Sequence, residues 1–330
     1  MEKHLELKEA IKRVAGDDVK ITHLNVNEED SLVTIAMVVP EGALSALHDE
    51  KMLKRSVIKV IKLDFGYTGV KLSVDVKKEA PVRSSHTKYI MVTSGKGGVG
   101  KSTTSANLAA CLARFGHKVG IIDADFYGAS IPKIFGMNDP QLRIDANEKI
   151  IPPQSEEGVM IMSTDFLVGD DQPLIWRGPM LGRMLEHLFK DVAWPEDTDY
   201  IIVDLPPGTS DIPLFLKDLI PEAKALVVTT PNQMASEIAI KSGEMAKTLG
   251  HQILGVVENM SYYINPANGN HDKIFGSGGG LAVAQRLETE VLAEISIGGV
   301  KEDKTGGIFA PHEENGLLYL GLANKVMKLF

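Results

Sequence analysis

From residue 89 to the end of the chain, short apolar runs rich in β-branched residues alternate with longer amphipathic stretches. Near-continuous apolar runs are typical of strands that are buried on both faces, and the amphipathic stretches between them indicate helices. The pattern therefore predicts an α/β domain over 89–330, doubly wound around a mainly parallel sheet. The predicted strands are YIMVTS, KVGIIDAD, GVMIMST, YIIVDLP, ALVVTTP and ILGVVENM.

The first 80 residues follow a different pattern, which predicts a small α+β domain. Helical spacing and β-branched runs alternate without the long apolar strands of the later region. The polar, proline-containing segment that follows is interpreted as a linker, with bounds 81–88. The predicted helices are 5–15 and 42–63, and the predicted strands are 19–26, 31–39 and 69–76.

Composition narrows the class of protein. The chain has 330 residues, of which 44% are hydrophobic and 24% charged, as in ordinary globular proteins. No apolar run reaches the roughly 18 residues of a membrane span, and the first ten residues lack the apolar core of a signal peptide. The single cysteine, Cys111, agrees with a cytoplasmic protein without disulfides. A net charge of −9 does not favour DNA as a partner.

The stretch SGKGGVGKSTT, residues 94–104, follows a predicted strand and opens a predicted helix. It fits the pattern G-x-x-x-x-G-K-[ST]. The glycines let backbone N–H groups surround a β-phosphate at a helix N-terminus. Lys101 would then bridge the β- and γ-phosphates, and Ser102 would bind Mg²⁺. The predicted nucleotide-binding residues of this loop are Gly95, Lys96, Gly97, Gly98, Val99, Gly100, Lys101, Ser102 and Thr103.

Three aspartates stand at the ends of predicted strands. Asp123 and Asp125 follow one strand, so that one carboxylate can hold hydrated Mg²⁺ while the other orients the attacking water. Asp204 ends an apolar strand in the arrangement called Walker B, which delivers a carboxylate to the metal. Ser102, Asp123 and Asp204 are therefore the predicted Mg²⁺ residues, in part through water.

Further candidates follow later strands. The Gly208 N–H lies in a turn where it can sense a γ-phosphate, and Asp211 is interpreted as a helix N-cap rather than a switch acid. Asn259 offers a donor and an acceptor, which suits an adenine edge, and Pro231 is expected to pack near the base.

The loop KGGVGKS resembles the deviant Walker A class of ATPases, which includes ParA, MinD and nitrogenase iron protein. Together with IIDADFYGASIP, WRGPM, VDLPPGTSDI, VTTPN, GVVENMSYY and IFGSGGG, it resembles the Mrp/ApbC family over residues 86–330. The resemblance implies an ATP-hydrolysing homodimer that carries iron–sulfur clusters to apoproteins. It also implies that Lys96 reaches the partner's nucleotide and that Asp125 orients water, so Lys96, Lys101, Asp125 and Asp204 are the predicted catalytic residues.

One motif of the cluster-carrying members is missing. They have Cys-x-x-Cys just after ENMS, whereas this chain has Asn265 and Asn268 in the sequence YYINPANGN. A neutral amide is a poor substitute for a thiolate, so an iron–sulfur cluster cannot be assigned from the motif. Asn, Pro and Gly are also good turn formers. In this respect the chain is similar to the cysteine-less Gram-positive branch of the family, which includes an ATP-dependent regulator.

Two functions therefore remain open: an ATPase that carries clusters, and a cluster-independent, ATP-gated regulatory or DNA-binding protein. Basic residues at 51–62, on one face of the predicted helix 42–63, could meet DNA or an acidic protein, although a solvated face is the simpler interpretation. Arg177 of WRGPM is assigned either to the nucleotide or dimer interface or to a structural role. No histidine pair shows zinc-ligand spacing.

Overall fold

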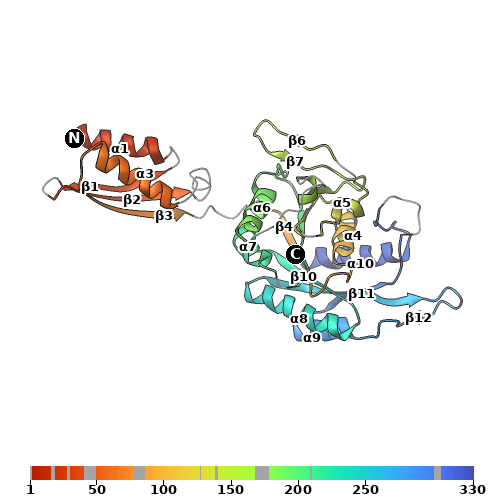
Figure 1. The fold of residues 1–330 in the computed structure, drawn as a ribbon. Helices are drawn as coiled ribbons and strands as arrows, with labels where there is room; N and C mark the ends of the chain where they lie inside the picture. The colour runs from red at the N-terminus through yellow and green to blue at the C-terminus, as the bar shows by residue number, and fades with distance from the viewer. Residues whose placement is uncertain are drawn as a thin grey trace. The chain divides into compact units, whose positions relative to one another are not determined.

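The computed structural model contains two compact units, Met1–Ala80 and Pro81–Phe330, each with its own hydrophobic core (Figure 1). The first part of the predicted helix at 42–63, most of the predicted linker and Arg177 lie outside the described residues. The structure describes residues 2–15, 19–27, 30–40, 50–77, 86–126, 128–137, 140–167, 178–208, 210–300 and 306–330.

The N-terminal unit is a three-stranded sheet with two helices on one face (Figure 1). The central strand β2 (Leu32–Pro40) pairs antiparallel with β1 (Lys20–Asn27) and parallel with β3 (Gly69–Lys77). The helix α3 (Glu50–Leu63) connects β2 to β3, and α1 (Glu2–Ala15) precedes the sheet. The helices α1 and α3 also contact each other.

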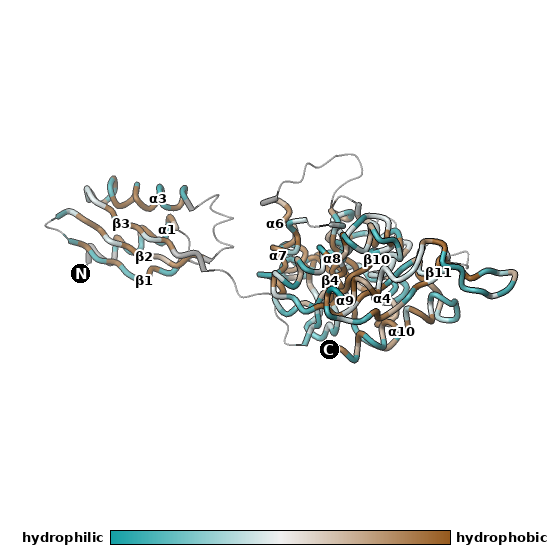
Figure 2. Tube along the Cα trace, turned by 90° about the horizontal axis from the view of Figure 1, so that it is seen from below, coloured by the Kyte–Doolittle hydropathy of each residue, from teal (hydrophilic) through white to brown (hydrophobic). Residues whose placement is uncertain are grey.

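Alternating residues of β2 face the helices of this unit. Val33, Ile35 and Met37 are fully buried, as are Leu53 and Ile61 of α3. In Figure 2, α3 alternates between apolar and polar positions along its length. The basic residues predicted for its polar face are present there and mostly exposed: Lys51, Lys54, Arg55, Lys59 and Lys62.

The second unit is built on an eight-stranded sheet with neighbours in the order β8-β5-β9-β4-β10-β11; β13 and β12 also pair with β11. All pairs are parallel except β11 with β12. The strands are β4 (Lys88–Ser94), β5 (Val119–Asp123), β8 (Met160–Ser163), β9 (Tyr200–Asp204), β10 (Lys224–Thr229), β11 (Gln252–Ile264), β12 (His271–Asp272) and β13 (Val291–Ser296).

Helices cover both faces of this sheet, which confirms the predicted doubly wound fold (Figure 1). A short hairpin of β6 (Arg143–Ile144) and β7 (Ile150–Ile151) and a 3₁₀ turn, η1 (Thr164–Phe166), complete the unit. The helices are α4 (Lys101–Arg114), α5 (Ile131–Ile134), α6 (Gly178–Lys190), α7 (Ile212–Leu219), α8 (Gln233–Thr248), α9 (Gly279–Arg286) and α10 (Glu314–Lys328).

The central strand β4 shows why both faces are covered. Ile90 and Val92 pack with α4 and α10, whereas Tyr89 and Met91 pack with α6 and α7. Strands whose two faces are both buried need apolar residues at every position, because successive side chains point to opposite sides. This explains the near-continuous apolar runs in the sequence.

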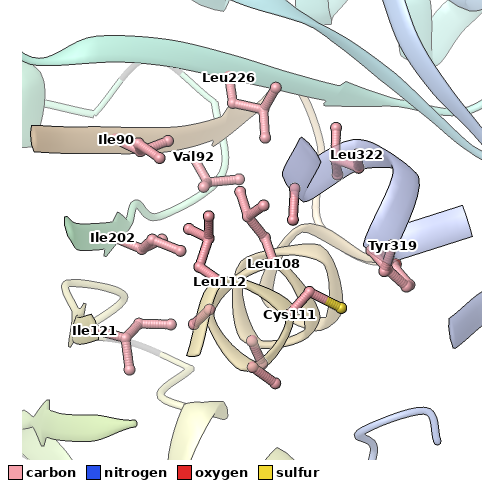
Figure 3. Packing of buried hydrophobic residues seen from close by; sticks show 14 of the residues in the cluster. Ile90, Val92, Leu108, Cys111, Leu112, Ile121, Ile202, Leu226, Tyr319 and Leu322 are labelled. Atoms are coloured by element: carbon pink, nitrogen blue, oxygen red, sulfur yellow. The ribbon is translucent and has the colours of Figure 1, made fainter. Parts of the chain in front are cut away.

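The helix α4 packs against the middle of the sheet through Leu108 and Leu112, which lie near Ile90 and Val92 (Figure 3). Cys111 points toward Tyr319 and the rest of α10 in the same view. Its thiol is buried like a small apolar side chain, and burial raises its pKa to about 11.

Because β4, β5 and β9 are parallel neighbours, their carboxyl ends meet at one edge of the sheet. The loop 95–100 follows β4, Asp123 ends β5 and Asp204 ends β9. The topology therefore gathers the predicted phosphate and metal residues in one place. Among the described ranges there is no helix with the length and apolarity needed to cross a bilayer.

Candidate functional site

The glycine loop 95–100 lies between β4 and α4 and is tightly packed. Gly98 and Gly100 have φ values of 79° and 83°, a region that favours glycine. A Cβ atom on Gly95 would lie 2.3 Å from the backbone nitrogen of Ala239, and one on Gly100 would lie 2.0 Å from Asn259 Nδ2. The loop therefore requires glycine for conformation and for space.

A buried cluster of polar side chains lies at the start of α4. Lys101 Nζ donates to Asp204 Oδ2 at 2.6 Å, and Ser102 Oγ donates to the same oxygen at 2.6 Å. The side chain of Asp204 is 0% exposed and that of Lys101 is 6% exposed. The cluster joins the two predicted phosphate- and metal-binding side chains of the loop to the predicted Walker B carboxylate.

Ser105 completes this cluster and was not predicted. Its hydroxyl donates to Asp204 Oδ1 at 2.5 Å, and the Lys101 carbonyl oxygen also lies 3.1 Å from it. Both carboxylate oxygens of Asp204 therefore accept hydrogen bonds from α4. The only sequence signal is a hydroxyl three residues after Ser102, which places both serines on the same face of the helix.

Asp123 anchors the segment that carries Asp125. Its Oδ2 accepts hydrogen bonds from the N–H groups of Ser130 and Ile131 at 3.0 and 3.1 Å, and its Oδ1 accepts from the Asp125 N–H at 3.2 Å. Burial, and next the nearby Asp204 carboxylate, raise the pKa of Asp123 to about 7. None of these bonds corresponds to the predicted contact with hydrated Mg²⁺, which stays a prediction.

Asp125 lies at the mouth of the cluster. Its Oδ2 is 3.9 Å from Lys101 Nζ, and its side chain is 13% exposed, against 0% for Asp204. The structure therefore brings Asp125 to the predicted site, and its role in orienting water stays a prediction.

The turn at Gly208 is connected to the start of the glycine loop. The Gly208 N–H donates to the Ser94 carbonyl at 2.8 Å, and the Ser242 hydroxyl lies 3.3 Å from the carbonyl oxygens of both Ser94 and Gly208. The Gly208 N–H, which was predicted to sense a γ-phosphate, thus already donates to the Ser94 carbonyl. It can contact a phosphate only if it gives up this hydrogen bond.

Two smaller expectations have different outcomes. Asp211 stands at the N-cap position of α7, but its side chain accepts no capping hydrogen bond. The position of Asp211 at the N-cap is as predicted, but the predicted hydrogen bond from the helix to its side chain is wrong.

Lys96 is half-buried at the loop, and within the described ranges its ammonium group has no ion-pair partner.

Asn259 lies against the glycine loop. Its Nδ2 donates to the Val99 carbonyl at 2.9 Å, and the residue is 8% exposed. Pro231 is also buried, and it follows the end of β10 on the same side of the sheet. Nδ2 uses one of its two hydrogens on the loop, which leaves Oδ1 and the second Nδ2 hydrogen of Asn259 for a base. Contact of either residue with adenine stays a prediction.

The stretch around Asn265 and Asn268 forms the turn of a hairpin between β11 and β12 (Figures 1 and 2). Asn265 Oδ1 accepts from the Ala267 N–H at 3.0 Å, and Asn268 Oδ1 accepts from the Asn270 N–H at 2.9 Å. Asn265 Nδ2 also donates to Asp272 at 3.0 Å. Both amides therefore hold the turn itself.

The rest of the described molecule offers no replacement for the missing cysteines as cluster ligands. Within the ranges that the structure describes, no three His, Cys, Asp or Glu side chains gather as metal ligands. Cys111 is buried in α4, on a different element from the hairpin. The donor set of the described residues thus does not fit a conventional iron–sulfur site.

A glycine loop between a strand and a helix, joined to a lysine, a serine and a Walker B aspartate, defines a P-loop NTPase. Residues 85–314 match the family described as ParA, NUBPL iron-transfer P-loop NTPase. The chain therefore belongs to this family, which confirms the resemblance to Mrp/ApbC proteins.

Individual relatives agree with this assignment. The chain is 43% identical to an iron–sulfur cluster carrier protein of Bacillus subtilis over 72% of this chain and 67% of the relative. It is 40% identical to the protein of that name from Escherichia coli, over 76% and 68%.

Solved structures show the same fold. A nucleotide-binding protein of Archaeoglobus fulgidus in complex with ADP has a TM-score of 0.56 and 32% identity, covering 73% of this chain and 88% of that chain. The septum site-determining protein MinD of Pyrococcus horikoshii, complexed with Mg-ADP, has a TM-score of 0.53 and 24% identity, covering 74% and 97%. The second likeness concerns the fold alone.

Proposed function

We propose that this protein binds ATP with Mg²⁺ and hydrolyses it to ADP and phosphate, slowly, as a homodimer. The observation that carries the proposal is the buried cluster of Lys101, Ser102 and Asp204 at the start of α4. A buried lysine–aspartate pair is costly to maintain unless its groups are used or well bonded. The complex of the Archaeoglobus fulgidus relative with ADP supports the choice of nucleotide.

The loop, the start of α4 and Asp204 have different roles in binding the nucleotide. The N–H groups of residues 97–101 and the N-terminus of α4 stabilise the phosphate charge. Lys101 exchanges its bond to Asp204 for the β- and γ-phosphates. Ser102 and Asp204 are hard oxygen donors that suit Mg²⁺, which when bound neutralises developing charge on the phosphates.

Asp125 is the proposed water-orienting residue. Its carboxylate accepts a hydrogen bond from the attacking water, whose oxygen forms the new bond to the γ-phosphorus while the bond to the ADP oxygen breaks. The proton of the water leaves with the phosphate product. Asp123 holds the segment around Asp125 in place through the N–H groups of Ser130 and Ile131.

Lys96 supports the proposed dimer. It stands in the loop without an ion-pair partner within the described part of its own chain. The phosphate oxygens of a nucleotide in a facing subunit are acceptors that such a lysine can bind across a dimer interface. This assigns the extra lysine of the deviant loop to contact between subunits.

Nucleotide affinity tests the proposal. Wild-type protein titrated with a fluorescent ATP analogue should bind it, and Lys101→Ala should abolish binding. Asp165→Ala, which changes an exposed aspartate elsewhere in the same unit, is the control and should bind as wild type does. Unchanged affinity in Lys101→Ala would exclude the glycine loop as the binding site.

The partner or cargo of the ATPase has two candidates. The names of the relatives favour an iron–sulfur cluster as cargo for transfer to apoproteins. The hairpin favours a cluster-independent, ATP-gated regulatory protein, because the side chains of Asn265 and Asn268 accept hydrogen bonds from the backbone of the turn. The hairpin observation concerns this chain directly, so it is the reason for retaining the second candidate.

Anaerobic reconstitution with iron and sulfide separates the two candidates. The variant carrying both Asn265→Cys and Asn268→Cys is the positive control, because it restores the ligand spacing. A stable stoichiometric cluster in the wild type would establish carriage through other ligands. Its absence in the wild type, with a cluster in the double variant, would favour the regulatory protein, and ATP-dependent retention on DNA would then identify DNA as the partner.

A further inference from the structure

A second glycine-rich segment, GSGGG at 276–280, runs into the first turn of α9 and has no role in the proposed hydrolysis. Gly276 and Gly278 have φ values of 91° and 81°. Such a segment before a helix has the form of an anion-binding loop. Here, however, the Gly280 N–H donates to Glu258 Oε2 at 2.5 Å, so the chain's own carboxylate occupies the start of α9.

The glycines allow this contact because the backbone comes very close to β11 and to the end of β10. A Cβ atom on Gly280 would lie 2.8 Å from Glu258 Cβ. One on Gly279 would lie 2.6 Å from the carbonyl oxygens of both Thr230 and Pro231. The segment is therefore a close-packed docking loop between two strand ends of the nucleotide side.

Glu258 is held firmly at this position. It is 3% exposed, and its Oε1 accepts from the Ser261 hydroxyl at 2.6 Å. Within the described residues it has no cation partner. A carboxylate buried in this way depends on its hydrogen bonds and on the positive end of α9. The contact thus fixes β11 to α9 at residue 258.

The next residue along the strand is Asn259, which contacts the P-loop. Met260 follows with φ 55°, and the pairing of β11 with β13 shifts register between Glu258 and Tyr262. A left-handed residue at such a bulge is strained, and bulges re-aim neighbouring side chains. The bulge and the Glu258 contact together set the direction of Asn259 toward the Val99 carbonyl.

We propose that Glu258 is a positioning residue of the nucleotide site: by docking the 276–280 loop onto β11, it fixes Asn259 so that its Oδ1 faces the base. This inference rests on the proposed function, because it assigns Asn259 to the adenine of bound ATP. Glu258 itself touches neither base nor phosphate. The GSGGG segment consequently serves the base side of the site and is not a second phosphate loop.

The test compares ATP with inorganic triphosphate by calorimetric titration in the presence of Mg²⁺. Glu258→Gln keeps the size of the side chain but disturbs the acceptor for the Gly280 N–H, and Gly280→Ala forces the same contact apart. We expect each to weaken ATP binding about tenfold, as for loss of a hydrogen bond to a charged group. Binding of inorganic triphosphate, which has no base, should change less than about twofold.

Two controls exclude a general loss of structure. Glu313→Gln changes another buried glutamate that accepts a backbone N–H, from Ala310 at 2.6 Å, at the start of α10. Gly321→Ala places a methyl group on a helical glycine with nothing within 4 Å. Both should bind ATP as the wild type does, and circular dichroism checks the folding of every variant.

A double-mutant cycle shows whether Glu258 acts through Asn259. If it does, Glu258→Gln combined with Asn259→Ala binds ATP no more weakly than Asn259→Ala alone. Additive losses, or equal losses of ATP and triphosphate, would overturn the inference. Should Glu258→Gln fail to fold, Ser261→Ala takes its place in the cycle, with the same expectation. A wild type that does not bind ATP would instead overturn the proposed function, and the inference with it.

Discussion

Replacing Ser105 by alanine removes one of the hydrogen bonds that hold the buried Asp204 carboxylate. The bond from Ser105 Oγ to Asp204 Oδ1 is 2.5 Å long, and both residues are 0% exposed. Hydrogen bonds to charged groups contribute about 1.5–3 kcal/mol. The higher helix propensity of alanine offsets roughly 0.5 kcal/mol of this loss of stability. The free energy of unfolding should therefore fall by about 2 kcal/mol.

The same substitution should affect Mg²⁺ more than ATP. The remaining donors to Asp204, Lys101 and Ser102, both contact Oδ2, so the loss of Ser105 frees the carboxylate to rotate. Loss of a residue that orients a metal ligand typically weakens metal affinity by about 10- to 100-fold. We expect the Mg²⁺ concentration for half-maximal ATP turnover to rise about tenfold, while ATP affinity without Mg²⁺ stays within about twofold.

Turnover measured against free Mg²⁺ checks this expectation, together with thermal unfolding in the absence of nucleotide. Ser105→Thr keeps the hydroxyl and should restore much of the Mg²⁺ response. Ser155→Ala is the matched control, since Ser155 is a buried hydroxyl that accepts from the Val159 N–H elsewhere in the unit. An Mg²⁺ requirement that does not move in Ser105→Ala would refute the reasoning about Asp204.

Three further predictions concern the loop and the core. Gly100→Ala should weaken ATP binding at least about tenfold, because its Cβ would overlap Asn259. Gly116→Ala is the control, because Gly116 has a similar φ of 89° but open space around it, and it should bind ATP as the wild type does. Equal effects of the two substitutions would point to backbone strain alone. Light scattering with ATP and Mg²⁺ should find a dimer for the wild type and a monomer for Lys96→Ala; a dimer in both would remove Lys96 from the interface. Burial raises the pKa of Cys111 to about 11, so below pH 9 its thiol stays neutral, and iodoacetamide at pH 8 should alkylate the folded protein far more slowly than the unfolded one; similar rates would contradict the burial.

The sequence predicted the elements whose pattern is strong and local. The apolar runs of β4, β5, β9 and β10 and the loop at 95–100 have a single physical interpretation, and the fold confirms it. The edge strand β13 was not predicted, because its side chains are buried at some positions and partly exposed at others. The strand β11 is longer than expected, because it continues past the sheet into the hairpin with β12.

The site was less predictable where partners lie far apart in the chain. The contact of Ser105 with Asp204 joins residues 99 positions apart, and no local sequence pattern predicts it. The same holds for Gly280 with Glu258, although the unusual density of glycines was a signal that two backbones come close. The engaged N–H of Gly208 depends on the conformation of a turn, which residue types alone do not determine.

Release of phosphate from ATP by wild type and by Asp125→Ala tests the central claim most directly. The wild type should release phosphate in a reaction that requires Mg²⁺. Asp125→Ala should bind ATP within about threefold of the wild type but lose turnover by about 100-fold or more, because it lacks the group that orients water. Asp165→Ala should behave as the wild type. Equal turnover in Asp125→Ala, or no phosphate release by the wild type, would contradict the account.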